Sequence, residues 1–279
     1  MPKLNVEFED YYDVSNHYDF FRQPVGINVI LKSAEKHFIN KKLDEISVLD
    51  CGCGTGNYLK KLSMEFGKCT GFEINEGMYN VAKGKLAKHA NVTLYNESIL
   101  DATTDEKFDI VLITQVLHHL DDAESNFKNL KIFIENASNF LKEDGLLYIN
   151  TCNPKYVKYS YWFYNLLPER VVDIYASKYA PLKIIKDSAK KFGLNSYLKQ
   201  KVEENMMKEF YYFSEFGPLN ASWRKSDSIW SLVSEDELDK IKKIVTYNVK
   251  NDNMRNYIHS VANRNKYGQS VFLVFHKSF

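Results

Sequence analysis

The chain has 279 residues, of which 44% are hydrophobic and 26% charged, a composition typical of a globular protein with a buried core. Its 37 Lys and Arg nearly balance its 36 Asp and Glu, so the net charge of +1 gives no overall field to attract nucleic acid or an anionic membrane. No stretch approaches the roughly 18 consecutive apolar residues of a membrane span. The acidic, aromatic opening segment does not resemble a secretory signal, so we expect a cytoplasmic protein.

The cysteines have neither the CxxC spacing nor the paired histidines of a zinc site. They are Cys51, Cys53, Cys69 and Cys152. We expect them to be reduced and mostly buried, and we expect no bound metal. The sequence is compatible with either a monomer or a homodimer.

Hydrophobic patterning predicts alternating strands and helices in the first half of the chain. Residues 24–40 carry apolar side chains at helical spacing and predict a first helix. We expect strands at 46–50, 69–74, 92–96, 108–114 and 145–151, with helices at 57–66, 77–86 and 122–141 between them. This alternation indicates βαβ units and a parallel sheet with helices on both faces. Such sheets bind ligands at the carboxyl ends of their strands.

The pattern changes after residue 151. Residues 153–180 are rich in aromatic side chains and predict helical structure, and residues 182–193 predict a further helix. A second aromatic stretch covers 209–223. A capping box from Ser234 to Glu237 predicts a helix over 234–245, and the apolar run 270–277 should return to the sheet.

We therefore expect one domain over 1–279, with no repeat or linker dividing it. Its expected parts are an N-terminal helical lid (1–40), a core (46–152), a cap (153–230), and a C-terminal helix with the last strands (231–279).

The motif VLDCGCGTGNY at 48–58 lies between a predicted strand and a predicted helix. A glycine-rich motif indicates a ligand-binding loop only in this context. Gly52, Gly54 and Gly56 allow a sharp turn and a close approach of the backbone to a ligand, because they lack a Cβ. Their GxGxG spacing differs from the GxGxxG of dinucleotide-binding proteins. The GxxxxGK[ST] pattern of nucleoside triphosphatases is absent.

Three further polar sites follow predicted strands. Glu73 ends the second strand, where its carboxylate can accept both hydroxyls of a ribose. The NES segment at 96–98 follows the third strand, in position to meet an adenine edge. Thr114 and Gln115 lie at the carboxyl end of the fourth strand.

Taken in order, VLDCGCGTGNY, GFEIN, NESILD, FDIVLITQVLHHL and FLKEDGLLYINT resemble the class I methyltransferases that depend on S-adenosylmethionine (SAM). The resemblance covers about half of the chain. It implies an α/β fold, with a Rossmann-like seven-stranded mostly parallel sheet, helices on both faces, an antiparallel last strand and an aromatic-rich helical cap inserted after strand five. It also implies SAM as cofactor and S-adenosylhomocysteine as product.

The resemblance assigns cofactor contacts position by position. The implied contacts are Asp50, Gly52, Cys53, Gly54 and Gly56 for the methionine portion, Glu73 for the ribose, Ile74, Glu97, Ser98 and Ile99 for the adenine, and Thr114 and Gln115 beside the sulfonium. Glu97 departs from the usual aspartate, which puts its direct contact in question.

His118 and His119 are candidate catalytic bases, since a neutral imidazole can accept a proton near pH 7. His119 is the better candidate. The alternative is that LHHL only shapes the turn after strand four.

The N-terminal segment offers Tyr11, Tyr18 and Arg22 ahead of the first helix. As a lid, it would cover bound SAM with its tyrosines, and Arg22 would pair with the SAM carboxylate. The alternative is an ordinary amphipathic helix packed on the sheet.

The aromatic stretches suggest a substrate-binding cap, although they would also suit a core. Candidate acceptor contacts are Tyr159, Tyr161, Trp162, Tyr211, Tyr212 and Trp223. Aromatic walls suit an apolar acceptor or a cationic amine, the latter through cation–π contact. The WRKSDSIW segment (223–230) is expected to be an ordered loop that either binds substrate or closes over it.

These features predict a SAM-dependent methyltransferase that acts on an N, O or C nucleophile of a small-molecule acceptor by in-line displacement. The fourth-strand motif lacks the (N/D)PP(Y/F) signature of many nucleic-acid amino methyltransferases. A protein or tRNA methyltransferase and an inactive SAM-binding sensor or partner subunit remain alternatives. A dehydrogenase is disfavoured by the GxGxG spacing.

Overall fold

A computed structural model describes residues 19–262 and 268–278. Seven strands form one sheet in the order β3-β2-β1-β4-β5-β7-β6. The strands are β1 Ser47–Cys51, β2 Lys68–Phe72, β3 Val92–Tyr95, β4 Phe108–Thr114, β5 Leu141–Thr151, β6 Leu194–Lys201 and β7 Val271–Lys277. Strands β1 to β5 run parallel to one another, and β7 runs antiparallel to both β5 and β6. The predicted mostly parallel sheet with an antiparallel last strand is confirmed.

Helices cover both faces of the sheet, as predicted. They are α2 Ile27–His37, α3 Asn57–Leu62 and α4 Glu76–Leu86 on one face, and α5 Lys128–Phe140 and α7 Leu182–Lys191 on the other. Every residue of β4 is buried, and its successive side chains enter opposite layers: Leu112 packs with the α2 layer and Val111 with the α5 layer. All four cysteines are buried and free.

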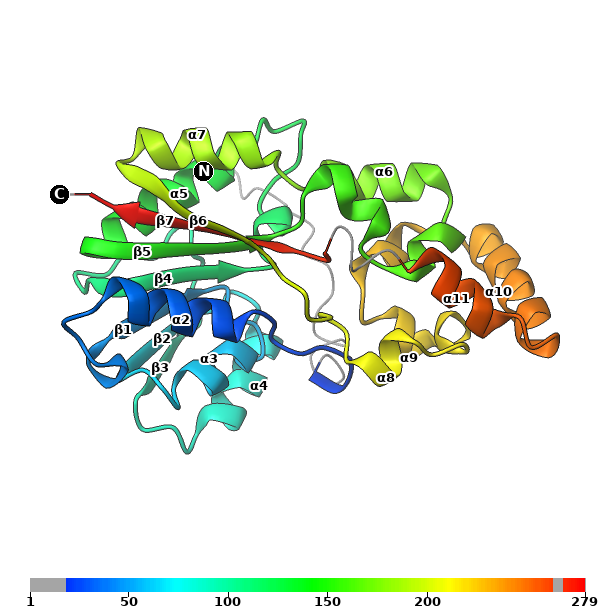
Figure 1. The fold of residues 1–279 in the computed structure, drawn as a ribbon, viewed down its shortest axis with the longest axis horizontal. Helices are drawn as coiled ribbons and strands as arrows, with labels where there is room; N and C mark the ends of the chain where they lie inside the picture. Colours follow the sequence, from blue (N-terminus) through cyan, green and yellow to red (C-terminus); the bar gives the residue numbers. More distant parts are fainter. Residues whose placement is uncertain (1–18, 263–267, 279) are drawn as a thin grey trace.

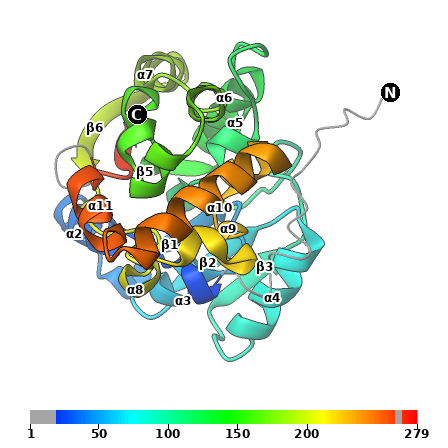
Figure 2. The same ribbon diagram turned by 90° about the vertical axis from the view of Figure 1, so that its right-hand side faces the viewer.

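The cap consists of two segments that leave the sheet beyond the carboxyl ends of its parallel strands (Figure 1). After β5 come the 3-10 turns η3 Pro154–Tyr159 and η4 Trp162–Leu166, then α6 Glu169–Ser177. After β6 come α8 Glu209–Tyr212, η5 Gly217–Leu219, α9 Ala221–Arg224, η6 Ser228–Leu232, α10 Glu235–Lys250 and α11 Met254–Val261. Figure 2, in which the cap faces the viewer, shows α10 crossing in front of the sheet.

The cap differs from the predicted layout in three ways. The helix expected over 153–180 is broken, because Pro168 holds Leu167 in an extended conformation (ψ 149°). The expected cap range 153–230 contains β6, which returns to the sheet edge. Helices α10 and α11 also belong to the cap, so it continues past residue 230.

The helix predicted over 122–141 begins only at Lys128, because Phe127 has a left-handed conformation (φ 52°). The predicted capping box of Ser234 and Glu237 is confirmed at the start of α10. None of the helices in the described ranges is long and apolar enough to cross a membrane.

Aromatic side chains make the core of the cap. Trp162 and Tyr212 are fully buried, and Trp223 is nearly so. The indole of Trp162 donates to the carbonyl of Tyr212 at 2.5 Å, and that of Trp223 donates to the carbonyl of Tyr211 at 2.8 Å. The two buried indole N–H groups are therefore satisfied, and the rings fix the two cap segments against each other.

We predict that Trp162→Ala lowers the free energy of unfolding by roughly 3–5 kcal/mol, because it removes a buried ring and leaves a cavity. Phe210→Ala is the control: this side chain is 82% exposed, and its loss should change stability by less than about 0.5 kcal/mol. Urea denaturation of both variants measures the difference. Equal stability of the two variants would contradict the assignment of Trp162 to the cap core.

Candidate functional site

A cavity of about 980 Å³ lies between the carboxyl edge of the sheet and the cap. Its wall includes the glycine loop after β1, the ends of β2 and β4, the segments after β3 and β5, and both cap segments. Parallel strands place their carboxyl ends at one edge, which is why motifs far apart in sequence meet here.

The three glycines of the loop have positive φ values of 79°, 55° and 78° for Gly52, Gly54 and Gly56. A Cβ at Gly52 would lie 2.8 Å from Val116, and one at Gly56 would lie 2.8 Å from Leu86. A Cβ at Gly54 would meet no described atom within 4 Å, and Gly54 lines the cavity. Packing therefore explains two of the glycines, whereas Gly54 borders open space in the cavity.

Glu73 is buried at the end of β2 and joins two loops. One carboxylate oxygen accepts the N–H of Gly54 and the other accepts the N–H of Asn75, both at 2.8 Å. Burial raises the pKa of Glu73, while the N–H groups of Asn75, Gly54 and Ile74 oppose that rise. A carboxylate has about four acceptor positions, so hydroxyl groups in the cavity can still bind to it.

Asp50 lies beneath the glycine loop and is fully buried. Among the described residues, neither of its carboxylate oxygens has a hydrogen-bond partner. Burial, with a contribution from the charge of Glu73, raises the pKa of Asp50 to about 8. Asp50 and Gly56, both predicted as cofactor contacts, are not part of the described cavity wall.

The remaining predicted cofactor positions line the cavity. They are Cys53, Ile74, Glu97, Ser98, Ile99, Thr114 and Gln115. Gln115 has a positive φ of 57°, and its amide donates to Asn150 at 2.6 Å. Sequence reasoning missed Asn75 and Met78, which also line this end; the N-cap position of Asn75 before α4 was a usable signal.

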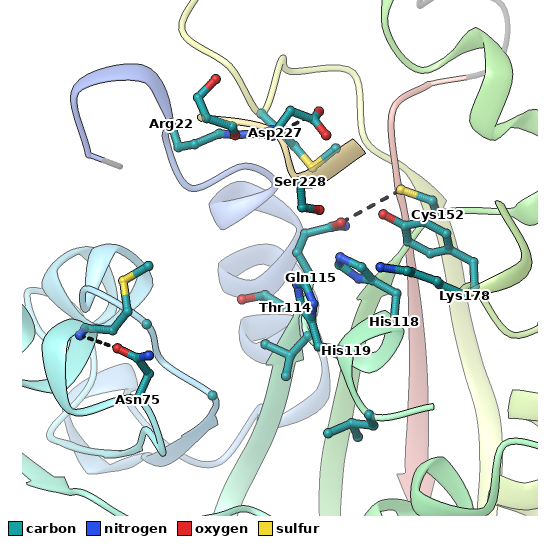
Figure 3. Close-up of a pocket in the computed structure, with 18 of the residues that line it drawn as sticks. Arg22, Asn75, Thr114, Gln115, His118, His119, Cys152, Lys178, Asp227 and Ser228 are labelled. Carbon is teal, nitrogen blue, oxygen red and sulfur yellow. Dashed lines mark hydrogen bonds and ion pairs between the residues drawn. The ribbon is translucent and has the colours of Figure 1, made fainter. Parts of the chain in front are cut away.

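His118 and His119 lie together on the turn η2 (Leu117–His119), with ring centroids 4.0 Å apart. Burial lowers the pKa of both rings, and the positive charge of Lys178 contributes to both shifts; the pKa of His119 falls to about 4. Both imidazoles are therefore neutral near pH 7. Figure 3 shows them with Gln115 and Lys178 on the side of the cavity away from Asn75.

The segment ahead of α2 bridges core and cap. The carboxylate of Asp19 accepts from Thr55 at 2.5 Å and from Asn57 at 2.7 Å. The guanidinium of Arg22 pairs with Asp227 at 3.1 Å and donates to the carbonyl of Ser226 at 2.7 Å.

Arg22 lines the cavity, but these contacts attach it to the cap, so its predicted pairing with a SAM carboxylate stays a prediction. Tyr11 and Tyr18 lie outside the described residues.

Five of the aromatic residues predicted to touch substrate are not part of the described cavity wall: Tyr159, Trp162, Tyr211, Tyr212 and Trp223. Trp162, Tyr212 and Trp223 form the cap core instead. Of the aromatic candidates, Tyr161 lines the cavity, together with Tyr164, Tyr175, Tyr179 and Trp230, which sequence reasoning missed. Part of the 223–230 segment also lines it, from Arg224 to Ser228.

One group away from the cavity could hold a metal ion. His37, Asp144 and His276 each offer a ligand atom within 4.8 Å of the others. Hydrogen bonds already explain their proximity: Asp144 accepts from His276 at 2.7 Å, and its carbonyl lies 2.8 Å from the His37 ring nitrogen.

Comparison with known proteins settles the family. The model of the methyltransferase domain matches residues 42–216, which is more than half of the chain. The chain belongs to the methyltransferase domain family.

Two curated relatives resemble parts of this methyltransferase domain. (S)-coclaurine N-methyltransferase of Papaver somniferum is 30% identical over 122 residues, covering 42% of this chain and 33% of the relative. Ubiquinone biosynthesis O-methyltransferase of Coxiella burnetii is 28% identical over 134 residues, covering 45% of this chain and 54% of the relative. The matches thus span between a third and about half of the relatives' length.

A crystal structure of a putative methyltransferase from an antibiotic biosynthesis pathway of Anabaena variabilis resembles the whole methyltransferase fold. Its TM-score is 0.69 at 15% identity, covering 91% of this chain and 98% of that one. At this sequence identity the likeness shows the fold alone, and the reaction has to be inferred from the residues of the site.

We predict that Asp50→Asn flattens the pH dependence of stability of the cofactor-free domain. The Asp50 pKa is 3.8 in an unfolded chain and about 8 in the folded one. As the pH rises through that window, the unfolded state loses a proton that the folded state retains, so the parent loses stability.

Urea denaturation at about pH 5 and pH 8 measures the effect, with the exposed Asp105→Asn as control. The Asp50 variant should lose less stability between the two pH values than the parent and the control. An identical loss in all three proteins would show that Asp50 ionises normally.

Proposed function

We propose that the chain binds SAM in this cavity and transfers its methyl group to a small-molecule acceptor, releasing S-adenosylhomocysteine. The observation that carries the proposal is the wall formed by Gly54 and Glu73. Gly54 leaves open the space that a Cβ would fill, and the Glu73 carboxylate stands beside it. A dinucleotide or triphosphate would call for a different glycine spacing.

The residues present fit an adenosyl cofactor. Glu73 would bind the ribose hydroxyls, with Ile74 and the 97–99 segment around the adenine. Thr114 and Gln115 would lie beside the sulfonium. Buried Asp50 has no described partner for either oxygen, and with a pKa raised to about 8 it keeps its proton near pH 7 when no cofactor is bound. The positive charge of a bound cofactor would favour its ionised form and attract it.

The size of the cavity and its position beneath the cap support a small acceptor. Ligand sites commonly occupy about 300–1,000 Å³, and this cavity, at about 980 Å³, lies at the upper end of that range. It therefore has room for a cofactor and a second molecule. The cap segments form much of its wall, which suits an enclosed acceptor better than an open groove for a protein or tRNA.

The cofactor supplies an activated methyl group, and in-line transfer depends on alignment and exclusion of water. The cap and the segment around Arg22 exclude water from one side. His119, with its pKa lowered to about 4, is a weak proton acceptor at neutral pH. We infer that the two histidines position the acceptor rather than deprotonate it. An inactive sensor remains the alternative, and it would bind SAM without turnover.

We predict micromolar binding of SAM, on the order of −7 to −8 kcal/mol, with competition by S-adenosylhomocysteine. Gly54→Val should abolish binding, because the added side chain fills the open space in the wall. Isothermal titration calorimetry measures both. Tight binding of NAD in place of SAM would contradict the proposal.

Gly193→Val is a matched control for the cost of a left-handed residue, roughly 1–2 kcal/mol. Gly193 also has a positive φ of 77° and open space at its Cβ, but it follows α7 and does not line the described cavity. This variant should lose similar stability and keep its SAM affinity. Equal loss of SAM binding in both variants would assign the effect to destabilisation.

We predict that Glu73→Ala weakens SAM binding by roughly 1.5–3 kcal/mol, through loss of charge-assisted hydrogen bonds. Glu73→Gln, which keeps the shape and one acceptor oxygen, should lose less. Calorimetry at a temperature where both variants are folded separates binding from stability. If Glu73→Ala binds SAM as tightly as the parent, the ribose assignment is wrong.

A further inference from the structure

We propose that His37, Asp144 and His276 form a binding site for a divalent transition-metal ion such as Zn²⁺. The three residues lie at the edge of the sheet opposite the cavity, where α2 ends, β5 begins and β7 ends. Figure 1 shows this edge on the left, away from the cap. The site is therefore independent of the proposed function. The expectation that the chain binds no metal rested on the cysteines, and this site uses none of them.

Both histidines continue buried rows of side chains to the edge of the fold. His37 is the last residue of α2 and follows buried Ala34 by three positions, so it lies on the helix face that packs against the sheet. His276 follows Phe272 and Val274 at alternate positions of β7, and both of these pack in the α2 layer. The two imidazole rings meet where these rows end, with centroids 5.1 Å apart.

Asp144 brings oxygen atoms to both rings. Its backbone has a left-handed conformation (φ 65°), which aspartate tolerates better than most residues. Its Oδ1 atom lies 2.7 Å from Nε2 of His276 and 3.4 Å from Nε2 of His37. Its carbonyl oxygen lies 2.8 Å from the same nitrogen of His37. One residue thus holds the Nε2 atoms of two histidines that are far apart in the sequence.

Two imidazole nitrogens and a carboxylate oxygen are ligands that Zn²⁺ prefers, whereas Mg²⁺ and Ca²⁺ prefer oxygen ligands. Zn²⁺ binds such atoms at about 2.0–2.2 Å, which places the ligands of a tetrahedral ion about 3.3–3.5 Å from one another. The oxygen of Asp144 and the nitrogen of His37 already have this separation, at 3.4 Å. His276 would move back from 2.7 Å to about 3.4 Å to admit the ion.

The hydrogen bonds that hold this group together without a metal ion also keep its ligand atoms near their binding positions. A neutral imidazole that carries its proton on Nδ1 presents a lone pair at Nε2. An ion between the three side chains would then take the place of the proton that each Nε2 shares with Asp144. It would join the end of α2 to two strands of the sheet.

The site is open enough for an ion to enter. The side chains of His37, His276 and Asp144 are 11%, 26% and 49% exposed, so water can reach them and complete a tetrahedral coordination. The neighbouring Lys277 donates to the carbonyl of Ser138 on α5 at 3.0 Å. Its positive charge therefore lies on the face of the sheet away from the two histidines, where it does not block a cation.

The test is a titration of Zn²⁺ into chelator-treated protein without a histidine tag, followed by isothermal titration calorimetry, with Mg²⁺ as a parallel titrant. Zn²⁺ should bind, and Mg²⁺ should give no measurable binding at the same concentrations. His276→Ala should weaken Zn²⁺ binding by about tenfold or more, because losing even an outer partner of a metal ligand costs about 10–100-fold. Asp144→Asn should weaken it as well, although it keeps an oxygen that can accept a hydrogen bond from a histidine.

His259→Ala is the matched control, because it removes an exposed histidine of α11 that is not part of the group. It should leave the Zn²⁺ affinity within about threefold of the parent. Near-ultraviolet circular dichroism shows whether each variant keeps the parent fold, and Asp144→Asn serves if His276→Ala does not. The proposal is overturned if Zn²⁺ does not bind, or if a folded His276 or Asp144 variant binds it as tightly as the parent. Hydrogen bonds alone would then account for the group.

Discussion

The buried carboxylate of Glu73 accepts one hydrogen bond from the loop after β1 and another from the start of α4, each at 2.8 Å. These two bonds set the distance between loops that follow neighbouring strands. The loop needs such an anchor, because its three glycines have more backbone freedom than other residues in the unfolded chain. That freedom is lost when the folded loop fixes them at positive φ. The N–H groups also offset the cost of burying the carboxylate, so one group both shapes the cavity and keeps an acceptor available for a ligand.

The cap depends on a second kind of constraint, aromatic packing. Trp162, Tyr212 and Trp223 hold its two segments together, and the Arg22–Asp227 pair attaches them to the segment ahead of α2. Asp19 on that segment in turn contacts Thr55 in the glycine loop. The core, the segment ahead of α2 and the cap thus meet around one cavity.

The sequence predicted the sheet well, because its strands depend on local patterns, and most of the residues predicted to bind a cofactor line the cavity. Alternating apolar runs identify β1 to β5, and the GxGxG loop must follow a strand to function. Strand β6 was missed because its residues are mostly polar and exposed at the sheet edge, which hides the hydrophobic signal.

The cap was predicted only in outline. The aromatic content of the sequence indicated a cap. It could not distinguish Trp162 in the cap core from Tyr161 on the cavity wall, since both are buried aromatic residues one position apart. Tyr175 and Tyr179 are four residues apart in the sequence, but α6 ends at Ser177. The stacking of Tyr179 on His118 is a long-range contact, which no local pattern encodes.

In the proposed function, a methyl group passes from SAM to a small molecule in this cavity. The most direct measurement is to incubate the protein with methyl-labelled SAM and an extract of its source organism, and then to separate small molecules from macromolecules. We expect the label in a small-molecule product that carries the methyl group, and an equal amount of unlabelled S-adenosylhomocysteine. Label confined to protein or RNA, or SAM bound without any transfer, would contradict it.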